Sequence, residues 1–219
     1  MKLHNIIHTN WLATLRLNYK VEGWKGVIRM PIKVYGPLKL SLAGAIILPP
    51  HSTRNTVIIN SEHEDYTAAS GKSELKIHGT WKVGGFLRLG PDTCIIIEKN
   101  ASLETGTDTY LGRDTQIHCS NHIHIGSNVF AGEAYICDSS IHPIVSSGIE
   151  KNILGEVMIG DGTYLGFRTT LLKGTVIPIG SVVGSGAVCS SDFSKSGTEK
   201  LFICGNPAQV KATNTTARF

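Results

Sequence analysis

A histidine at position 142 stands where the regular pattern of the chain stops. The segment DSSIHPI runs from Asp138 to Ile144, and residues 143–158 (PIVSSGIEKNILGEVM) break a pattern that holds on both sides. Histidine titrates near neutral pH, so it can take a proton from a hydroxyl group. Long loops in compact folds are often functional. We therefore consider His142 a candidate general base, with Glu133, Asp138 or a backbone carbonyl oxygen as the acceptor that orients its ring.

Two other groups of residues suggest different chemistry. Cys137 lies five residues before His142, which would suit a Cys/His nucleophile, but it takes the first position of a six-residue unit. That position is expected to point inward, so we predict a small buried side chain. Four residues have spacing that superficially resembles a metal site: His118, Cys119, His122 and His124. Their side chains should diverge around a turn, so we expect no metal within one chain.

These candidates lie within a six-residue repeat. Residues 159–188 read IGDGTY, LGFRTT, LLKGTV, IPIGSV and VGSGAV, and the same pattern occupies residues 77–94 and, with short slips, 97–136. A period of six fits neither an amphipathic helix nor a hairpin meander. If each unit supplies one strand and one turn, three units close a coil and coils stack about 4.8 Å apart. The sequence therefore predicts an all-β parallel solenoid with aliphatic residues inside and Gly, Asn and Asp at the turns.

The composition fits one main body with appended ends. The chain has 219 residues, 24 of them glycine, and 41% are hydrophobic. We predict an N-terminal basic arm at 1–33, a repeat body at 34–192 with loops at 61–76 and 143–158, and a C-terminal tail at 193–219.

Charge is concentrated in the N-terminal arm. The first 40 residues hold seven Lys or Arg and one acid, whereas the whole chain has a net charge of +4. A basic arm on a slightly acidic body favours contact with phosphates, on a membrane surface or on an activated substrate, although a solvated face explains it equally well. We expect no nucleic-acid binding, because no basic run carries interleaved aromatic residues.

The cysteine pattern and the absence of targeting segments bear on location. Five cysteines are widely spaced with no C-x-x-C pair, which favours a reducing compartment. Residues 174–191 carry no charge, but glycines and a proline interrupt any spanning helix. No secretory signal is readable at the start. We expect a cytoplasmic protein, with peripheral contact at the inner face of the membrane through the basic arm.

The repeat resembles that of the hexapeptide-repeat acyltransferases, whose fold is a left-handed parallel β-helix. The resemblance covers residues 34–211, and the segments RMPIKVYG, LKIHGTWKVGG, DSSIHPI, LKGTVIP and CGNPAQVK are similar to those of capsule and O-antigen acetyltransferases. Periodicity predicts the parallel solenoid, whereas its left hand is implied by the resemblance alone.

The resemblance implies a catalytic role for His142. The family carries its catalytic histidine in an Asp-x-x-x-His-x-Ile element, which Asp138, His142 and Ile144 match. The histidine would take the proton of a sugar hydroxyl as that hydroxyl attacks the thioester of acetyl-CoA, in a direct transfer without an acyl-enzyme. Ser140 stands where members often have a second acid, and Ile141 where an aromatic residue or glycine is common, which bears on ring orientation and substrate preference.

The resemblance also implies a homotrimer that binds acetyl-CoA in the groove between neighbouring chains. Ser190 and Ser191 stand where many relatives have a Thr-Lys pair, so Lys195 or Lys211 would contact the phosphates, and Arg168 is bulkier than usual at its turn. The other positions that match donor-binding residues are Tyr164, Gly166, Phe167, Gly184 and Ser185.

We therefore predict an acetyl-CoA-dependent O-acetyltransferase that acts on a sugar hydroxyl of a surface polysaccharide or its precursor. One alternative is an amino-sugar N-acetyltransferase of the same fold. Others are a metalloenzyme like the γ-type carbonic anhydrases, with histidines shared across a subunit boundary, and a non-catalytic scaffold.

Overall fold

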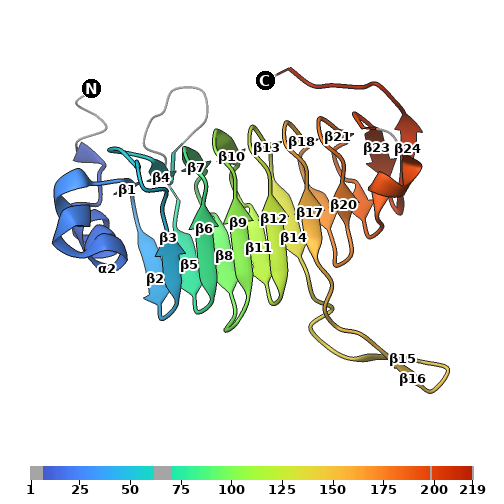
Figure 1. Ribbon diagram of the computed structural model, residues 1–219, viewed down its shortest axis with the longest axis horizontal. Helices are drawn as coiled ribbons and strands as arrows, with labels where there is room; N and C mark the ends of the chain where they lie inside the picture. Colours follow the sequence, from blue (N-terminus) through green and yellow to red (C-terminus); the bar gives the residue numbers. More distant parts are fainter. Residues whose placement is uncertain (1–6, 62–70, 198, 219) are drawn as a thin grey trace.

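A parallel β-helix makes up most of the molecule, as the computed structural model in Figure 1 shows. The structure describes residues 7–61, 71–197 and 199–218. The nine-stranded sheet contains, in order, β1 (Ile32–Val34), β4 (Val57–Ile59), β7 (Leu87–Leu89), β10 (Thr109–Leu111), β13 (Phe130–Ala131), β18 (Tyr164–Leu165), β21 (Val182–Val183), β23 (Phe202–Gly205) and β24 (Ala208–Ala212). The seven-stranded sheet contains β2 (Leu38–Leu42), β5 (Ser73–Ile77), β8 (Cys94–Ile97), β11 (Gln116–Cys119), β14 (Ala134–Cys137), β19 (Thr169–Leu171) and β22 (Val188–Cys189). The six-stranded sheet contains β3 (Ala45–Ile47), β6 (Thr80–Val83), β9 (Ser102–Thr105), β12 (His122–Ile125), β17 (Val157–Ile159) and β20 (Val176–Ile177).

From β1 to β20, each coil visits the three sheets in the same order, from the nine-stranded to the seven-stranded to the six-stranded sheet. In the last coil, β21 and β22 are followed by a 3₁₀ helix instead of a third strand. Equivalent residues of successive coils pair in parallel: Ile117 pairs with Ile95 on one side and with Ile136 on the other. All three side chains are fully buried. Burial of such a side chain contributes about 1.5–3 kcal/mol, so these columns form the core, as the repeat predicted.

Glycine is required at one corner of the coils because the next coil lies too close for a side chain. A Cβ atom added to Gly166 would lie 2.7 Å from the backbone nitrogen of Ser185. The same crowding occurs at Gly90 and Gly112, where it involves the backbone of the following coil. The glycine that often follows the aliphatic residue of a repeat therefore allows coils to stack.

A helix covers the open end of the first coil. Helix α2 (Trp11–Arg29) presents Thr14 and Asn18 to edge strand β1. The Asn18 side chain accepts from the amide of Ile32 at 3.0 Å and donates to its carbonyl at 2.7 Å, while the amide of Val34 donates to Thr14 Oγ1 at 3.1 Å. These bonds satisfy backbone groups that would otherwise offer an edge for pairing. The predicted basic arm thus contains an end cap. Within the described part of the chain, no helix is long and apolar enough to cross a membrane.

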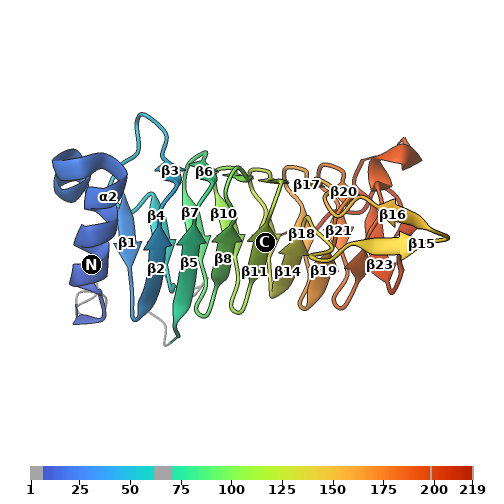
Figure 2. The same ribbon diagram turned by 90° about the horizontal axis from the view of Figure 1, so that it is seen from below.

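A hairpin projects from the body where the repeat is interrupted. Strands β15 (Ile144–Ser146) and β16 (Ile149–Lys151) pair antiparallel between β14 and β17, and Figures 1 and 2 show them extending away from the β-helix. All residues from 141 to 151 are exposed. The predicted loop at 143–158 therefore contains this hairpin.

Two other boundaries differ from the expected ones. In the predicted loop at 61–76, residues 62–70 lie outside the described residues, and β5 already begins at Ser73. In the predicted tail, a 3₁₀ helix (Phe193–Ser196) is followed by β23, which pairs in parallel with β21, and by the antiparallel β24. The β-helix thus continues past residue 192, because β23 pairs with the free edge of β21 and extends the nine-stranded sheet.

Candidate active site

His142 sits on a tight turn at the base of the projecting hairpin. Its amide donates to the carbonyl oxygen of Ser140 at 2.6 Å, which places Ile141 at the centre of a three-residue turn with φ of 65°. The amide of Ile141 donates to Ser139 Oγ at 2.9 Å. A positive φ is uncommon for a β-branched residue and marks local strain. His142 is itself exposed, so its side chain is open to a substrate.

Lys173 ties the two ends of the hairpin together. This residue follows β19 in the next coil, and its Nζ donates to Ser140 Oγ at 3.2 Å and to the carbonyl oxygen of Asn152. The amide of Ser140 also donates to the carbonyl of Ile153 at 2.8 Å. The turn that carries His142 is therefore fixed to the body. We did not identify Lys173 from the sequence, although its place in LLKGTV puts it at a turn of the coil that follows the hairpin.

Asp138 contacts the preceding coil, whereas we had considered it as an acceptor for the histidine. Its fully buried carboxylate accepts from the amide of Ser120 at 2.7 Å and from the amide of Asn121 at 2.8 Å. Among the described residues, no hydrogen bond joins Asp138 to the His142 ring. The carboxylate thus links its own coil to the preceding coil, at the corner where the hairpin leaves the body.

Glu133 lies at the opposite end of β14 from His142. A four-residue strand is about 13 Å long, so one chain does not bring this carboxylate to the ring. Glu133 instead lies 3.4 Å from the Arg168 guanidinium. Arg168 has a φ of 57°, at a turn position where Asp92, Asp114 and Gly186 of other coils also have positive φ.

Cys137 is buried, but not in the core column that the repeat predicted. Its side chain is 2% exposed, and its Sγ lies 3.1 Å from the carbonyl oxygen of Ser139. It pairs with His118, which points outward, while Ile136 occupies the inward position beside it. The expected inward orientation was therefore wrong by one residue, because the strand alternation continues from Ile136. Its burial supports the prediction that Cys137 is not an open nucleophile.

The residues with metal-like spacing point in different directions. His118 faces outward against the Tyr135 ring, with 5.7 Å between centroids, and burial lowers its pKa. Cys119 faces the core, where burial raises its pKa to about 12. His122 and His124 belong to β12 in another sheet. The described ranges contain no group of three or more His, Cys, Asp or Glu residues placed to hold a metal ion.

The residues predicted to bind the acyl donor stack at one corner of the β-helix. Tyr164 pairs with Val182, so the turn at Gly166 lies over the turn at Gly184. The two glycine amides donate to the carbonyl oxygens of Val183 and Ile203 at 2.8 Å. These amides therefore hold successive coils together.

The side chains at this corner are more accessible. Phe167 is 59% exposed and packs one edge against Gly132, and Ser185 is exposed. Tyr164 is half-buried and stacks on Phe130, with 5.6 Å between ring centroids. The outer surface of the corner thus presents the aromatic ring of Phe167 and the hydroxyl group of Ser185.

The two predicted phosphate-binding lysines lie farther along the chain. Lys195 Nζ lies 3.8 Å from Asp192, and Lys211 Nζ lies 3.0 Å from Gln209 Oε1. Both side chains are exposed.

The catalytic candidate and the donor corner occupy different edges of the prism. His142 lies where the chain leaves the seven-stranded sheet for the six-stranded sheet, whereas Phe167 and Ser185 lie where it enters the seven-stranded sheet. One whole face separates these edges. A single chain therefore does not bring the two parts of the predicted site together.

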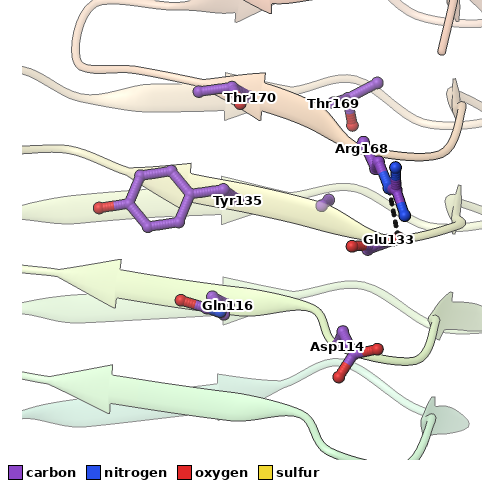
Figure 3. A pocket seen from close by; sticks show the side chains of 8 residues that line it. Asp114, Gln116, Glu133, Tyr135, Arg168, Thr169 and Thr170 are labelled. Carbon is purple, nitrogen blue, oxygen red and sulfur yellow. Dashed lines mark hydrogen bonds and ion pairs between the residues drawn. The ribbon is translucent and has the colours of Figure 1, made fainter. Parts of the chain in front are cut away.

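A polar cavity lies on that face. It has a volume of about 180 Å³. In Figure 3, Tyr135 lies between Thr170 and Gln116 of the neighbouring strands, and Glu133 and Arg168 are joined at the other end. The lining residues are Asp114, Gln116, Glu133, Ala134, Tyr135, Arg168, Thr169 and Thr170. Apart from Glu133, we did not predict these as site residues. The available signal was the run of polar residues at outward positions of successive strands.

Comparisons with known proteins support the fold. A scan against family models found no match. The chain is 34% identical over 126 residues to the protein named Probable acetyltransferase Rv3034c of Mycobacterium tuberculosis, which covers 52% of this chain and 41% of that protein. It superposes on the polySia specific acetyltransferase NeuO with a TM-score of 0.55 and 19% identity, over 86% of this chain and 83% of that one. It also superposes on the polysialic acid O-acetyltransferase OatWY with a TM-score of 0.55 and 21% identity, over 84% of this chain and 92% of that one.

The fold is that of these acetyltransferases. The predicted left-handed parallel β-helix is thereby confirmed. The chain spans less than half the length of its relative from Mycobacterium tuberculosis. In this acetyltransferase fold, the hairpin that carries His142 is the main departure from a regular prism.

Proposed function

We propose that this protein transfers an acetyl group from acetyl-CoA to a hydroxyl group of a carbohydrate, with His142 as general base. The observation that carries the proposal is the exposed, constrained turn that presents His142 at the break of the β-helix. The sequence similarity to an acetyltransferase and the shared fold of two polysialic acid acetyltransferases support this reaction class.

In this reaction, the main task of His142 is to transfer a proton. Its neutral imidazole takes the proton of the acceptor hydroxyl as the oxygen attacks the thioester carbonyl. The carbon–sulfur bond then breaks, and the departing thiolate receives the proton from the imidazolium, so no group of the protein is acylated. A base positioned in this way contributes about 10²- to 10⁴-fold to the rate. The turn fixed by Lys173 supports such positioning, because it holds the backbone from which the ring projects.

We infer that the working unit is a homotrimer. The donor corner and His142 lie on different edges of one chain, so a neighbouring chain can supply the missing edge to each site. In this arrangement Phe167 and Ser185 line the path of the pantetheine arm, with Tyr164 beside them. Lys195 and Lys211 are the exposed cations that we assign to the phosphates of acetyl-CoA.

The polar face between the two edges suits a carbohydrate acceptor. The cavity offers hydroxyl, amide and carboxylate groups around the Tyr135 ring. An aromatic ring beside hydrogen-bonding groups can hold the apolar face and the hydroxyls of a sugar together. A saccharide that follows β14 would reach from this cavity to His142, over about 13 Å. That length favours an acceptor larger than one sugar, such as a polysaccharide or its precursor.

A thermal unfolding scan with acetyl-CoA tests the donor without knowledge of the acceptor. At about 100-fold excess over Kd, a ligand that binds only the folded state adds about 2.7 kcal/mol. A chain of this length gains about 2–4 °C per kcal/mol, so we expect Tm to rise by several degrees. Phe167→Asp should reduce the rise, whereas Ile179→Asp, at an exposed position on another turn, should not. An unchanged Tm in the folded wild type would contradict the proposal.

A further inference from the structure

The outward face of helix α2 is unusually apolar for an exposed surface. Thr14, Leu17 and Asn18 face the body and are buried. The helix kinks at Gly23, and six large apolar side chains on its exposed side are between 40% and 80% exposed: Trp11, Leu12, Leu15 and Tyr19 before the kink, and Trp24 and Ile28 after it. Contiguous apolar surface of this kind marks an interaction site rather than ordinary solvated surface.

The charges on the same face are all positive. Arg16, Lys20 and Lys25 are exposed among the apolar side chains. The one acid of the helix is Glu22, which lies 3.7 Å from Arg29 and is partly buried. Apolar side chains that enter a bilayer and Lys or Arg side chains that contact anionic headgroups both stabilise binding to an anionic membrane.

The position of α2 makes this face available to a flat partner. Figures 1 and 2 show the helix lying across the N-terminal end of the β-helix, so its outward face points away from the body along the long axis. Trp11 begins the helix, and Trp24 directly follows the kink and packs on Tyr19, with 5.5 Å between ring centroids; both tryptophans are exposed. Exposed Trp and Tyr side chains suit the headgroup region of a bilayer.

A small cavity between α2 and β1, next to Trp11, is lined by two cations. Lys33 and Arg54 line a cavity of about 70 Å³ together with Trp11, and no carboxylate in the described part of the chain pairs with either cation. Lys33 is only 8% exposed, and its ammonium lies 4.8 Å from the centroid of the Tyr35 ring. Burial and the charge of Arg54 lower the pKa of Lys33. Two cations without a counter-ion fit the oxygens of a phosphate group.

We propose that the outward face of α2 docks on a membrane that contains anionic lipid, with a lipid phosphate held between Lys33 and Arg54. Leu12 and Ile28 enter the interface, and the basic residues of the helix meet the headgroups. A second copy of this chain fits the face less well, because a symmetric contact would set its cations against the same cations. This inference concerns a surface remote from His142 and does not depend on the proposed reaction.

Docking by this face would determine how far the candidate active site lies from the membrane. β14, which leads to His142, lies four strands from β2 in the seven-stranded sheet. With about 4.8 Å between neighbouring strands, His142 is about 20 Å farther from the membrane than the first coil. The docked enzyme would then act on a saccharide extending outward from the surface.

The tryptophans give a direct measurement of docking. Of the three tryptophans, Trp81 is buried in the core and bonds to Thr105, whereas Trp11 and Trp24 lie on α2. We expect phosphatidylcholine vesicles with 30% phosphatidylglycerol to shift the emission to shorter wavelength and to co-sediment the protein. Binding should be at least tenfold weaker to pure phosphatidylcholine and should weaken as salt rises. Equal binding to both vesicles, or none to either, would overturn the proposal.

Variants separate the two parts of the surface. The double variant Leu12→Gln/Ile28→Gln should bind anionic vesicles at least tenfold more weakly, and Lys33→Met should reduce the preference for anionic vesicles without abolishing it, because the basic residues of the helix remain. The control Ile179→Gln/Lys99→Gln changes exposed residues of the body and should bind like wild type. Each variant is first checked for an unchanged far-ultraviolet spectrum and Tm. If the α2 variant changes the oligomeric state and leaves vesicle binding intact, the face is a contact between copies and the proposal is wrong.

Discussion

The amide nitrogen of His142 lies 2.6 Å from the carbonyl oxygen of Ser140, so the candidate base is held by a turn that spans only three residues. Ile141 at its centre has a φ of 65°. Backbone strain of this kind costs about 1–3 kcal/mol and persists where the surroundings hold it in place. Here the surroundings are the contacts of Lys173 with Ser140 and Asn152.

Ile141→Pro should change the conformation of this turn without disturbing the rest of the fold. Proline fixes φ near −65°, so the histidine would leave its present position, while the exposed hairpin base should spare the core. We expect kcat to fall at least tenfold with little change in Tm. Ile141→Gly, which accepts the positive φ, should keep kcat within about threefold of wild type. Equal kcat values in the two variants would show that the turn does not position His142.

Asp138→Asn should affect stability more than catalysis. The side-chain amide would place its own N–H group against one of the two backbone N–H groups that now donate to the carboxylate. A buried donor left without a partner costs about 1–3 kcal/mol, and denaturant unfolding would measure the loss. We expect kcat to fall less than tenfold. A large loss of kcat at unchanged stability would instead indicate that Asp138 acts through His142.

Gly166→Ala should destabilise the stack of coils. Its new methyl group would meet the backbone of Ser185 within 2.7 Å, and such overpacking costs about 1–3 kcal/mol. The expected result is a lower Tm in the absence of any ligand. Ser185→Ala, at the exposed neighbouring position, is the matched control and should melt within about 1 °C of wild type. A wild-type Tm for Gly166→Ala would show that the corner has room for a side chain.

His118 should make stability depend on pH. Burial lowers its pKa from the ordinary 6.5, against the opposing effect of Glu98. The unfolded chain therefore takes up the proton first as pH falls, so the contribution of His118 is complete above pH 6.5 and is lost progressively below it. We expect Tm to decrease less between pH 7.5 and 5.5 in His118→Phe than in wild type. Parallel Tm curves for the two proteins would contradict this assignment.

The repeat could be predicted from the sequence because its physical basis is local. Each six-residue unit places an aliphatic residue inside, as the column of Ile95, Ile117 and Ile136 shows. The glycine that follows the aliphatic residue also has a local cause, because the next coil leaves no room for a side chain there, as at Gly166. The interruption at 143–158 was visible for the same reason, since the pattern is absent there.

Other features depend on contacts between distant residues and leave no periodic trace. The pairing of Asp138 with amides in the preceding coil is one example, and the role of Lys173 in holding the hairpin is another. Helix α2 was missed because its buried face is largely polar: Thr14 and Asn18 bond to an edge strand instead of packing as apolar residues. The orientation of Cys137 was misjudged because the unit that begins at Ala131 is one residue shorter than the unit of the preceding coil that begins at Leu111, which moves the inward position to Ile136.

The most direct test of the account measures transfer of radiolabelled acetyl from acetyl-CoA to a panel of saccharides, offered as hydroxyl and amino-sugar acceptors, by wild type and by His142→Ala. We expect wild type to label a hydroxyl acceptor, and His142→Ala to fold normally and lose at least about 100-fold in kcat. Near-normal turnover by the folded variant, or no transfer to any hydroxyl acceptor by wild type, would contradict the account.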